Sequence, residues 1–148
     1  MFARSCRFCR GSTLRDSRNS INFGAVPSSR PILLVEDDPD TRTMMTMALE
    51  IAGVDVVIAT NGVEAYNLAR AHRPRLILLD LMMPTMTGEE FRRAQLANQD
   101  IRDIPVVVVS ARHDATRIAR RMKASECLTK PIDFDKLAAV VTRYYRQT

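Results

Sequence analysis

The sequence lacks any apolar run long enough to cross a lipid bilayer, and no apolar core of a signal peptide stands near its start. Its cysteines number only three, which is too few and an odd count for a disulfide framework. These absences exclude an integral membrane protein and favour free thiols in the reducing cytoplasm. What remains is an ordinary globular composition, with 46% hydrophobic and 26% charged residues.

An excess of basic charge is also missing from most of the chain. The net charge of +5 arises within residues 1–30, which hold six arginines and a single acidic residue, Asp16. Residues 31–148 carry the other 16 basic and 16 acidic side chains. This neutral part does not indicate a nucleic-acid-binding groove. The total length of 148 residues fits one domain.

Residues 1–30 are rich in Arg and Ser and show neither helical nor strand periodicity. They are predicted to form a disordered basic extension of a domain that spans residues 31–148. Cys6 and Cys9 form a C-x-x-C, but the other candidate zinc ligands are scattered: His72, His113 and Cys127. We therefore interpret the pair as part of an exposed extension. An organelle transit peptide and an early assigned start codon are alternative explanations of the segment.

From Pro31 onward, short apolar runs alternate with helical patterns. Five runs are predicted as strands: Ile32 to Val35, Val54 to Thr60, Leu76 to Leu79, Val106 to Val109 and Cys127 to Thr129. Apolar runs of this kind are typical of a parallel sheet covered by helices on both faces. The predicted fold is α/β, a (βα)₅ doubly wound parallel five-stranded sheet in the flavodoxin-like strand order 2-1-3-4-5.

Helix start signals follow each predicted strand. Asp38 and Pro39 predict the start of the first helix and Gly53 predicts its end. The other four helices are expected to begin after Asn61, near Gly88, after Asp114 and after Asp133. Helices of this number and spacing supply one crossover after each strand and a last helix at the carboxyl end.

Polar residues stand where the predicted strands end. Glu36 and Asp37 follow the first strand, Asp80 follows the third, Ser110 the fourth and Lys130 the fifth. Each alone has an ordinary explanation, such as loop polarity or helix capping. In an open parallel sheet, however, ligands bind at the carboxyl ends of the strands, so these side chains are expected to share one pocket.

Such a pocket would gather three carboxylates, of Glu36, Asp37 and Asp80. Carboxylates about 4 Å apart repel by about 4 kcal/mol per pair at an effective dielectric near 20, so the cluster is unstable unless it is protonated or neutralised, and a hard divalent cation would neutralise it. Mg²⁺ suits oxygen ligands and keeps positions open for a phosphoryl oxygen. Lys130 and Ser110 can bind the other phosphoryl oxygens. Asp80, alone at the end of an apolar strand, is the candidate nucleophile.

Four motifs resemble the receiver family of two-component response regulators. They are ILLVEDD at residues 32–38, LILLDLMMPTMTG at 76–88, PVVVVSA at 105–111 and LTKP at 128–131. The resemblance covers residues 31–148. It implies that Asp80 accepts phosphate from a histidine kinase and that Mg²⁺ is held by Glu36, Asp37, Asp80 and the backbone carbonyl of Met82. It also implies that Ser110 and Lys130 bind the phosphoryl group and that the Lys130–Pro131 bond is cis.

One residue departs from the family pattern. Cys127 occupies a position where members often carry a Tyr or Phe that rotates as a switch. The departure concerns output and not phosphorylation. We expect Cys127 to pack passively and the signal to travel by backbone displacement around Ser110 to His113.

The expected function is that of a single-domain response regulator, which is not itself an enzyme. The chain ends directly after the fifth predicted helix, so it is expected to signal through an unknown partner protein, without nucleic acid or membrane. A basic run on the fourth helix either meets such a partner or is a solvated face: Arg117, Arg120, Arg121 and Lys123.

Two alternatives to this function remain open. A phosphorelay intermediate would pass phosphate from Asp80 to a histidine of a phosphotransfer protein. A Mg²⁺-dependent phosphohydrolase fits less well, because such enzymes often carry a D-x-D after the first strand and a cap over the substrate, whereas the solitary acid here follows the third strand.

Overall fold

The computed structural model describes residues 30–146, so the predicted disorder of the N-terminal extension and the interpretation of Cys6 and Cys9 lie outside the described residues. Ten elements alternate along the described chain: β2 (Ile32–Val35), α3 (Pro39–Ile51), β3 (Val56–Ala59), α4 (Gly62–His72), β4 (Leu76–Leu79), α5 (Gly88–Leu96), β5 (Val106–Ser110), α6 (Ala115–Arg121), β6 (Glu126–Thr129) and α7 (Phe134–Tyr145). Within residues 30–146, no helix combines the length and the apolar composition that a bilayer crossing requires.

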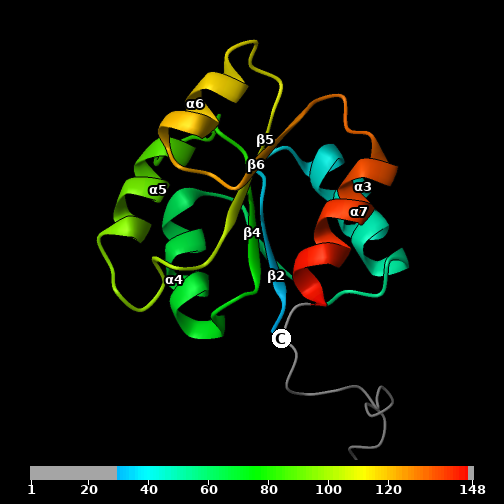
Figure 1. Cartoon of the computed structure of the whole chain (residues 1–148), viewed down its shortest axis with the longest axis horizontal. Helices are drawn as coiled ribbons and strands as arrows, with labels where there is room; N and C mark the ends of the chain where they lie inside the picture. The colour runs from blue at the N-terminus through cyan, green and yellow to red at the C-terminus, as the bar shows by residue number, and fades with distance from the viewer. Residues whose placement is uncertain (1–29, 147–148) are drawn as a thin grey trace, which may run out of the picture.

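The five strands form one parallel sheet in the order β3-β2-β4-β5-β6. Counted along the chain, this is the predicted order 2-1-3-4-5, which is confirmed. Helices α4, α5 and α6 cover one face of the sheet, and α3 and α7 cover the other (Figure 1). The winding direction reverses between β2 and β4, which places the carboxyl ends of these two strands at the edge where ligands bind in such sheets.

The second strand is shorter than its prediction of Val54 to Thr60. Val54 is buried, but its N–H donates to the carbonyl of Leu49 at 3.2 Å, so it belongs to the turn that ends α3. The N–H of Thr60 donates to the Glu64 carboxylate at 2.7 Å and thereby leaves the strand ladder. Hydrogen bonds to the end of α3 and to the first turn of α4 therefore exclude Val54 and Thr60 from β3.

The predicted helix starts are confirmed, and three of them are capped by the expected side chains. The carboxylate of Asp38 accepts the N–H of Thr41 at 2.8 Å, and Asn61 and Asp133 cap α4 and α7 in the same manner. Helix α6 begins after Asp114 as predicted, but this carboxylate makes no capping bond. It accepts hydrogen bonds from the guanidinium groups of Arg112 and Arg117 instead.

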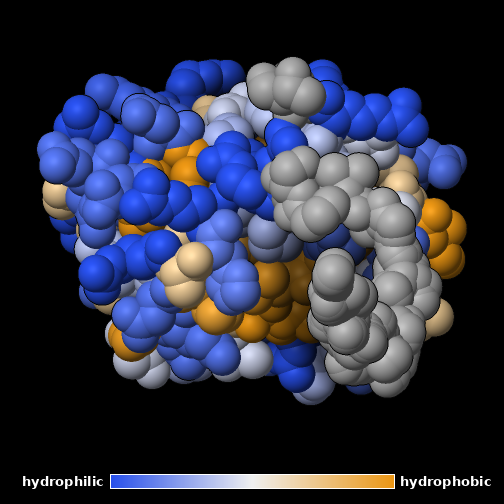
Figure 2. Space-filling model, turned by 90° about the horizontal axis from the view of Figure 1, so that it is seen from below, coloured by the Kyte–Doolittle hydropathy of each residue, from blue (hydrophilic) through white to orange (hydrophobic). Residues whose placement is uncertain are grey.

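Two apolar layers hold the sheet between its helices. Leu33 and Val35 of β2 face the layer under α4, α5 and α6, whereas Ile32 and Leu34 face the layer under α3 and α7. The three interior strands β2, β4 and β5 are buried along their length, which is why their sequences are apolar almost without alternation. Viewed from the amino-terminal edge of the strands, the surface is mostly hydrophilic with a few apolar patches (Figure 2).

Gly88 opens α5 directly beside the end of β4. A Cβ atom at this position would lie 2.6 Å from the carbonyl oxygen of Asp80 and 2.9 Å from the Cα of Leu81. Gly88→Ala should therefore lower the free energy of unfolding by about 1–3 kcal/mol, measured by urea denaturation, because the backbone beside Asp80 must move. Gly62→Ala is the comparison at another helix start, where the three atoms nearest to the added Cβ, at 2.7–2.8 Å, belong to the side chain of Met86 and not to the backbone. A larger loss in Gly62→Ala would contradict this account of the close approach.

Candidate functional site

Three carboxylates meet at the carboxyl ends of β2 and β4. One oxygen from each of Glu36, Asp37 and Asp80 lies within 4.8 Å of the others. Glu36 and Asp80 are 1% and 5% exposed, so their charges are largely withdrawn from water. The sequence placed these residues in one pocket, and the structure confirms their proximity.

Lys130, from the end of β6, reaches into this cluster. Its Nζ donates to Glu36 Oε1 at 2.9 Å and lies 3.7 Å from Asp80 Oδ2. The ammonium group therefore offsets part of the negative charge, and its shorter bond is to Glu36 rather than to the candidate nucleophile. The Lys130–Pro131 peptide bond is cis, as expected.

Two further predicted residues lie beside the cluster. The N–H of Met82 donates to Asp80 Oδ1 at 3.2 Å, which orients the carboxylate. The role of the Met82 carbonyl in a metal shell remains a prediction. Ser110 is fully buried at the end of β5, and its hydroxyl oxygen accepts the N–H of Arg112 at 3.2 Å.

The sequence did not single out Arg42, on the first turns of α3. Its guanidinium donates to the backbone carbonyls of Glu36 and Asp37, each at 3.2 Å. The N–H of Asp38 donates to Glu36 Oε2 at 3.2 Å. These contacts fix the acidic loop after β2. The only sequence signal for Arg42 was its place one turn after the helix start.

Burial and repulsion shape the ionisation of the cluster. Burial, followed by the negative charge of Glu36, raises the pKa of Asp80 to about 7, although the Met82 N–H and Lys130 act in the opposite direction. Burial tends to lower the pKa of Lys130, but its bond to Glu36 and the charges of Asp80 and Glu36 outweigh this effect and raise it. The cluster therefore carries negative charge that one lysine does not fully neutralise.

This donor set fits Mg²⁺. All three groups offer hard carboxylate oxygens, and they are close enough to share one ion. Burial and then repulsion by Glu36 raise the pKa of Asp80, and a bound cation would relieve that repulsion. The partial exposure of Asp37 leaves a route to solvent. A magnesium ion that keeps several of its water ligands needs such a route.

A pH dependence follows from the raised pKa of Asp80. The unfolded carboxyl titrates near 3.8 and the folded one near 7, so the folded state binds the proton more tightly and loses stability as the pH rises between these values. In metal-free buffer, Asp80→Asn should remove this loss and raise the free energy of unfolding at pH 8 by roughly 2–4 kcal/mol. Urea denaturation at pH 4 and pH 8 tests this result. An equal gain at both pH values would show that ionisation of Asp80 is not the cause.

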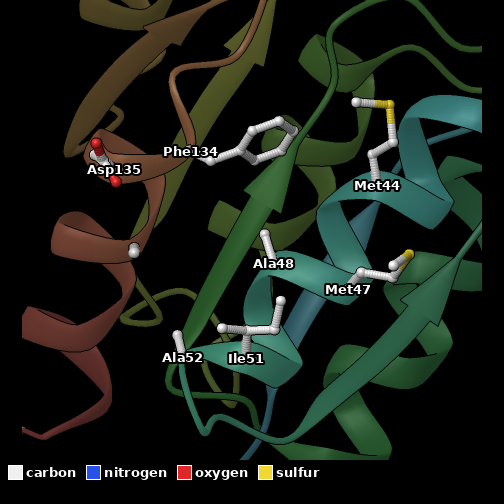
Figure 3. A pocket seen from close by; sticks show the side chains of 8 residues that line it. Met44, Met47, Ala48, Ile51, Ala52, Phe134 and Asp135 are labelled. Carbon is white, nitrogen blue, oxygen red and sulfur yellow. The ribbon is translucent and has the colours of Figure 1, made fainter.

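A separate groove lies between α3 and α7, with a volume of about 430 Å³. Methionine, alanine and isoleucine side chains of α3 line it together with Phe134, and Asp135 is the only titratable residue among the groups that form its wall (Figure 3). Met44 and Ile51 are exposed along it. Nothing in this groove resembles a cluster of reactive groups, so the acidic edge of the sheet is the candidate site.

Comparison with known proteins gives one family. Residues 32–142 match the response regulator receiver domain family. The chain is 30% identical over 118 residues to the polar-differentiation response regulator DivK of Brucella anthropi, which covers 78% of this chain and 95% of DivK. It is 36% identical over 124 residues to the DNA-binding dual master transcriptional regulator RpaA of Synechocystis, which covers 79% of this chain and 49% of that protein.

A solved structure gives the same result for the fold. The receiver domain of the sensor histidine kinase PA1611 from Pseudomonas aeruginosa, with a magnesium ion coordinated in its active-site cleft, superposes with a TM-score of 0.74. The two are 25% identical, and the comparison covers 81% of this chain and all of that domain.

Proposed function

Since the chain belongs to the response regulator receiver domain family, we propose that it accepts a phosphoryl group on Asp80 in a Mg²⁺-dependent reaction and signals through a partner protein. The donor would be a sensor histidine kinase or a phosphotransfer protein. The observation that carries the proposal is the buried Asp80 carboxylate, held beside two further carboxylates and Lys130. The family is one of signalling domains, and we propose no turnover of a small-molecule substrate.

Asp80 would act as the nucleophile. One of its carboxylate oxygens attacks the phosphorus of a phosphohistidine, the P–O bond forms as the P–N bond breaks, and the imidazole leaves with the electron pair of that bond. The Met82 N–H holds Asp80 Oδ1, and Oδ2 lies toward Lys130. The attacking group must be ionised, so any cation near Asp80 promotes the reaction by lowering its pKa.

Glu36, Asp37, Asp80 and the Met82 carbonyl are the residues that would hold Mg²⁺. When bound, the ion supplies positive charge that offsets the charge on the carboxylates and on the incoming phosphoryl group. Lys130 needs only to exchange its bond to Glu36 for one to a phosphoryl oxygen. Ser110 would donate its hydroxyl hydrogen to another oxygen, since a hydroxyl that accepts one bond can still donate.

We also place the protein in the cytoplasm, where a free thiol such as that of Cys127 stays reduced. The proposal also includes signalling through a partner protein that recognises the phosphorylated domain. The phosphate lifetime distinguishes this from a phosphorelay intermediate: in the intermediate, a phosphotransfer protein would remove the group from Asp80 rapidly.

The direct test is phosphorylation of the full chain with a small phosphodonor such as acetyl phosphate. With Mg²⁺, intact mass spectrometry should show the gain of one phosphoryl group that is stable in acid and lost in base, as an acyl phosphate is. With EDTA, the gain should fall by at least tenfold. Stoichiometric phosphorylation that is stable in base would exclude an aspartate acceptor and refute the proposal.

Mg²⁺ binding gives an independent prediction. At a free concentration of about 100 times its Kd, Mg²⁺ should raise the free energy of unfolding by about 2.7 kcal/mol. The Asp37→Asn variant should need at least ten times more Mg²⁺ to reach the same gain. It should stay folded, since Asp37 is only partly buried. Urea denaturation at several Mg²⁺ concentrations measures the shift. An unchanged Mg²⁺ dependence would remove Asp37 from the proposed ligand set.

A further inference from the structure

A groove with a volume of about 270 Å³ lies between α5 and α6, on the face of the sheet that does not carry α3 and α7. Four cationic side chains line it, Arg92, Arg93, Arg121 and Lys123, against one carboxylate, that of Glu89. Residues 31–148 as a whole carry equal numbers of basic and acidic side chains. The groove is therefore a local concentration of positive charge on a domain whose total charge is neutral.

Arg92 makes the charge of this groove unusual, because it is only 7% exposed. Its guanidinium donates to the carbonyls of Met122 and Lys123 at 3.0 and 2.8 Å and to the side-chain oxygen of Gln95 at 2.8 Å. All three acceptors are neutral, and burial lowers the pKa of Arg92. A buried cation held by neutral oxygens attracts anions strongly, because water screens it poorly.

The chain places one acid of its own at this groove. Arg121 of α6 donates to the carboxylate of Glu89 of α5 at 2.7 Å, with more than half of the arginine side chain still exposed. Arg93 and Lys123 are both exposed and can reach an approaching anion. Leu96, 40% exposed, adds an apolar contact at the same groove. The groove thus combines exposed cations with an apolar side chain.

We propose that this groove binds an acidic segment of a partner protein, which carries Asp or Glu side chains and one large apolar side chain for Leu96. The inference deepens the proposed function, because it gives the chemistry of the partner, but its test requires no phosphorylation. A nucleic acid fits less well. One helical turn from Arg121 toward the start of α6, Arg117 is already paired with Asp114 at 3.1 Å, and residues 31–148 carry no net positive charge that would attract a polyanion.

Selection from a random library of 12-residue peptides displayed on phage, with the full-length chain as the target, tests this proposal. The enriched peptides should share two or more acidic residues next to a large apolar residue. A labelled copy of the most enriched peptide then gives a Kd by fluorescence anisotropy. Arg93→Glu combined with Lys123→Glu should weaken its binding by at least tenfold, because the cations that meet the peptide become anions.

Two further variants separate the groove from general charge. Arg120→Glu changes an exposed arginine of α6 that does not line the groove, and the Kd should stay within about threefold of wild type. Glu89→Gln removes the internal competitor for Arg121 and should tighten binding by about threefold or more. Circular dichroism and urea denaturation establish that each variant is folded.

Several results would overturn the inference. These are enriched peptides without acidic residues, an equal loss of binding in the Arg120→Glu and Arg93→Glu/Lys123→Glu variants, and tighter binding of a 12-nucleotide single-stranded DNA than of the selected peptide. Failure of the proposed function has a different signature, the absence of acyl phosphate on Asp80. The two failures are therefore distinguishable in the same preparation of protein.

Discussion

Asp80→Asn should abolish the phosphoryl gain completely when the full chain is incubated with Mg²⁺ and acetyl phosphate. An amide oxygen carries no negative charge with which to attack phosphorus. Intact mass spectrometry should therefore detect no phosphorylated form of the variant. Asn is nearly isosteric with Asp and can still accept the Met82 N–H, so the fold around the residue should be preserved. The loss would therefore report the chemistry and not the packing.

Asp38→Asn is the control for Asp80→Asn. Asp38 neighbours the acidic cluster but is exposed, and its carboxylate caps α3 through the N–H of Thr41. Asn is an equally good N-cap, so this variant should be phosphorylated at close to the wild-type level. Undiminished phosphate on the Asp80→Asn variant, mapped by peptide mass spectrometry to another residue, would show that the acceptor has been misassigned.

Ser110→Ala should remove nearly all of the change in amide hydrogen exchange that phosphorylation produces across residues 110–116. Phosphate on Asp80 carries a charge of about −1.5 to −2 and must attract the Ser110 hydroxyl, which now accepts the N–H of Arg112. Movement of this hydroxyl releases that N–H, and the loop from Ser110 to α6 shifts with it. Without the Ser110 hydroxyl, the phosphate lacks this hydrogen bond to the loop.

Cys127→Ala is the matched comparison for Ser110→Ala. Cys127 lies on β6, partly buried, and burial raises the pKa of its thiol although the Thr116 side chain acts in the opposite direction. A small neutral thiol has no ring to rotate, so the exchange change in this variant should remain close to wild type, provided that Asp80 is phosphorylated to the same extent. If the change disappears in Cys127→Ala and survives in Ser110→Ala, then Cys127 transmits the signal and our account of the output is wrong.

The sequence predicted a basic run on the helix that became α6, but α6 ends at Arg121, so Lys123 lies beyond the helix, with a φ of 60°. Arg117 and Arg121 are paired with Asp114 and Glu89, respectively, so the run is not the uniform charged face that its sequence suggested. Arg121 and Lys123 line the groove with two arginines of α5, whereas Arg120 does not. The helical spacing was visible in the sequence, but the choice of ion-pair partners depended on the packing of α5 against α6.

Much of the fold and of the candidate site followed from the sequence because the relevant physics is local. Apolar runs of four residues flanked by capping residues predict buried strands and helix starts, and parallel winding alone brings the strand ends to one edge. Glu36, Asp37 and Asp80 could therefore be placed together from their positions immediately after β2 and β4. The proximity of Lys130 followed from the same rule.

The tertiary structure decided what the buried charges contact. Lys130 bonds to Glu36, 94 residues away, and no local pattern shows that it would prefer this carboxylate to Asp80. Arg92 and Gln95 belong to a polar helical sequence, which predicts exposed side chains, yet both are buried. They are tolerated there because backbone carbonyls 6 to 31 residues away accept their hydrogens: those of Ile101, Ile104, Met122 and Lys123. A buried polar group is stable only where such acceptors converge, and that convergence exists only in the folded chain.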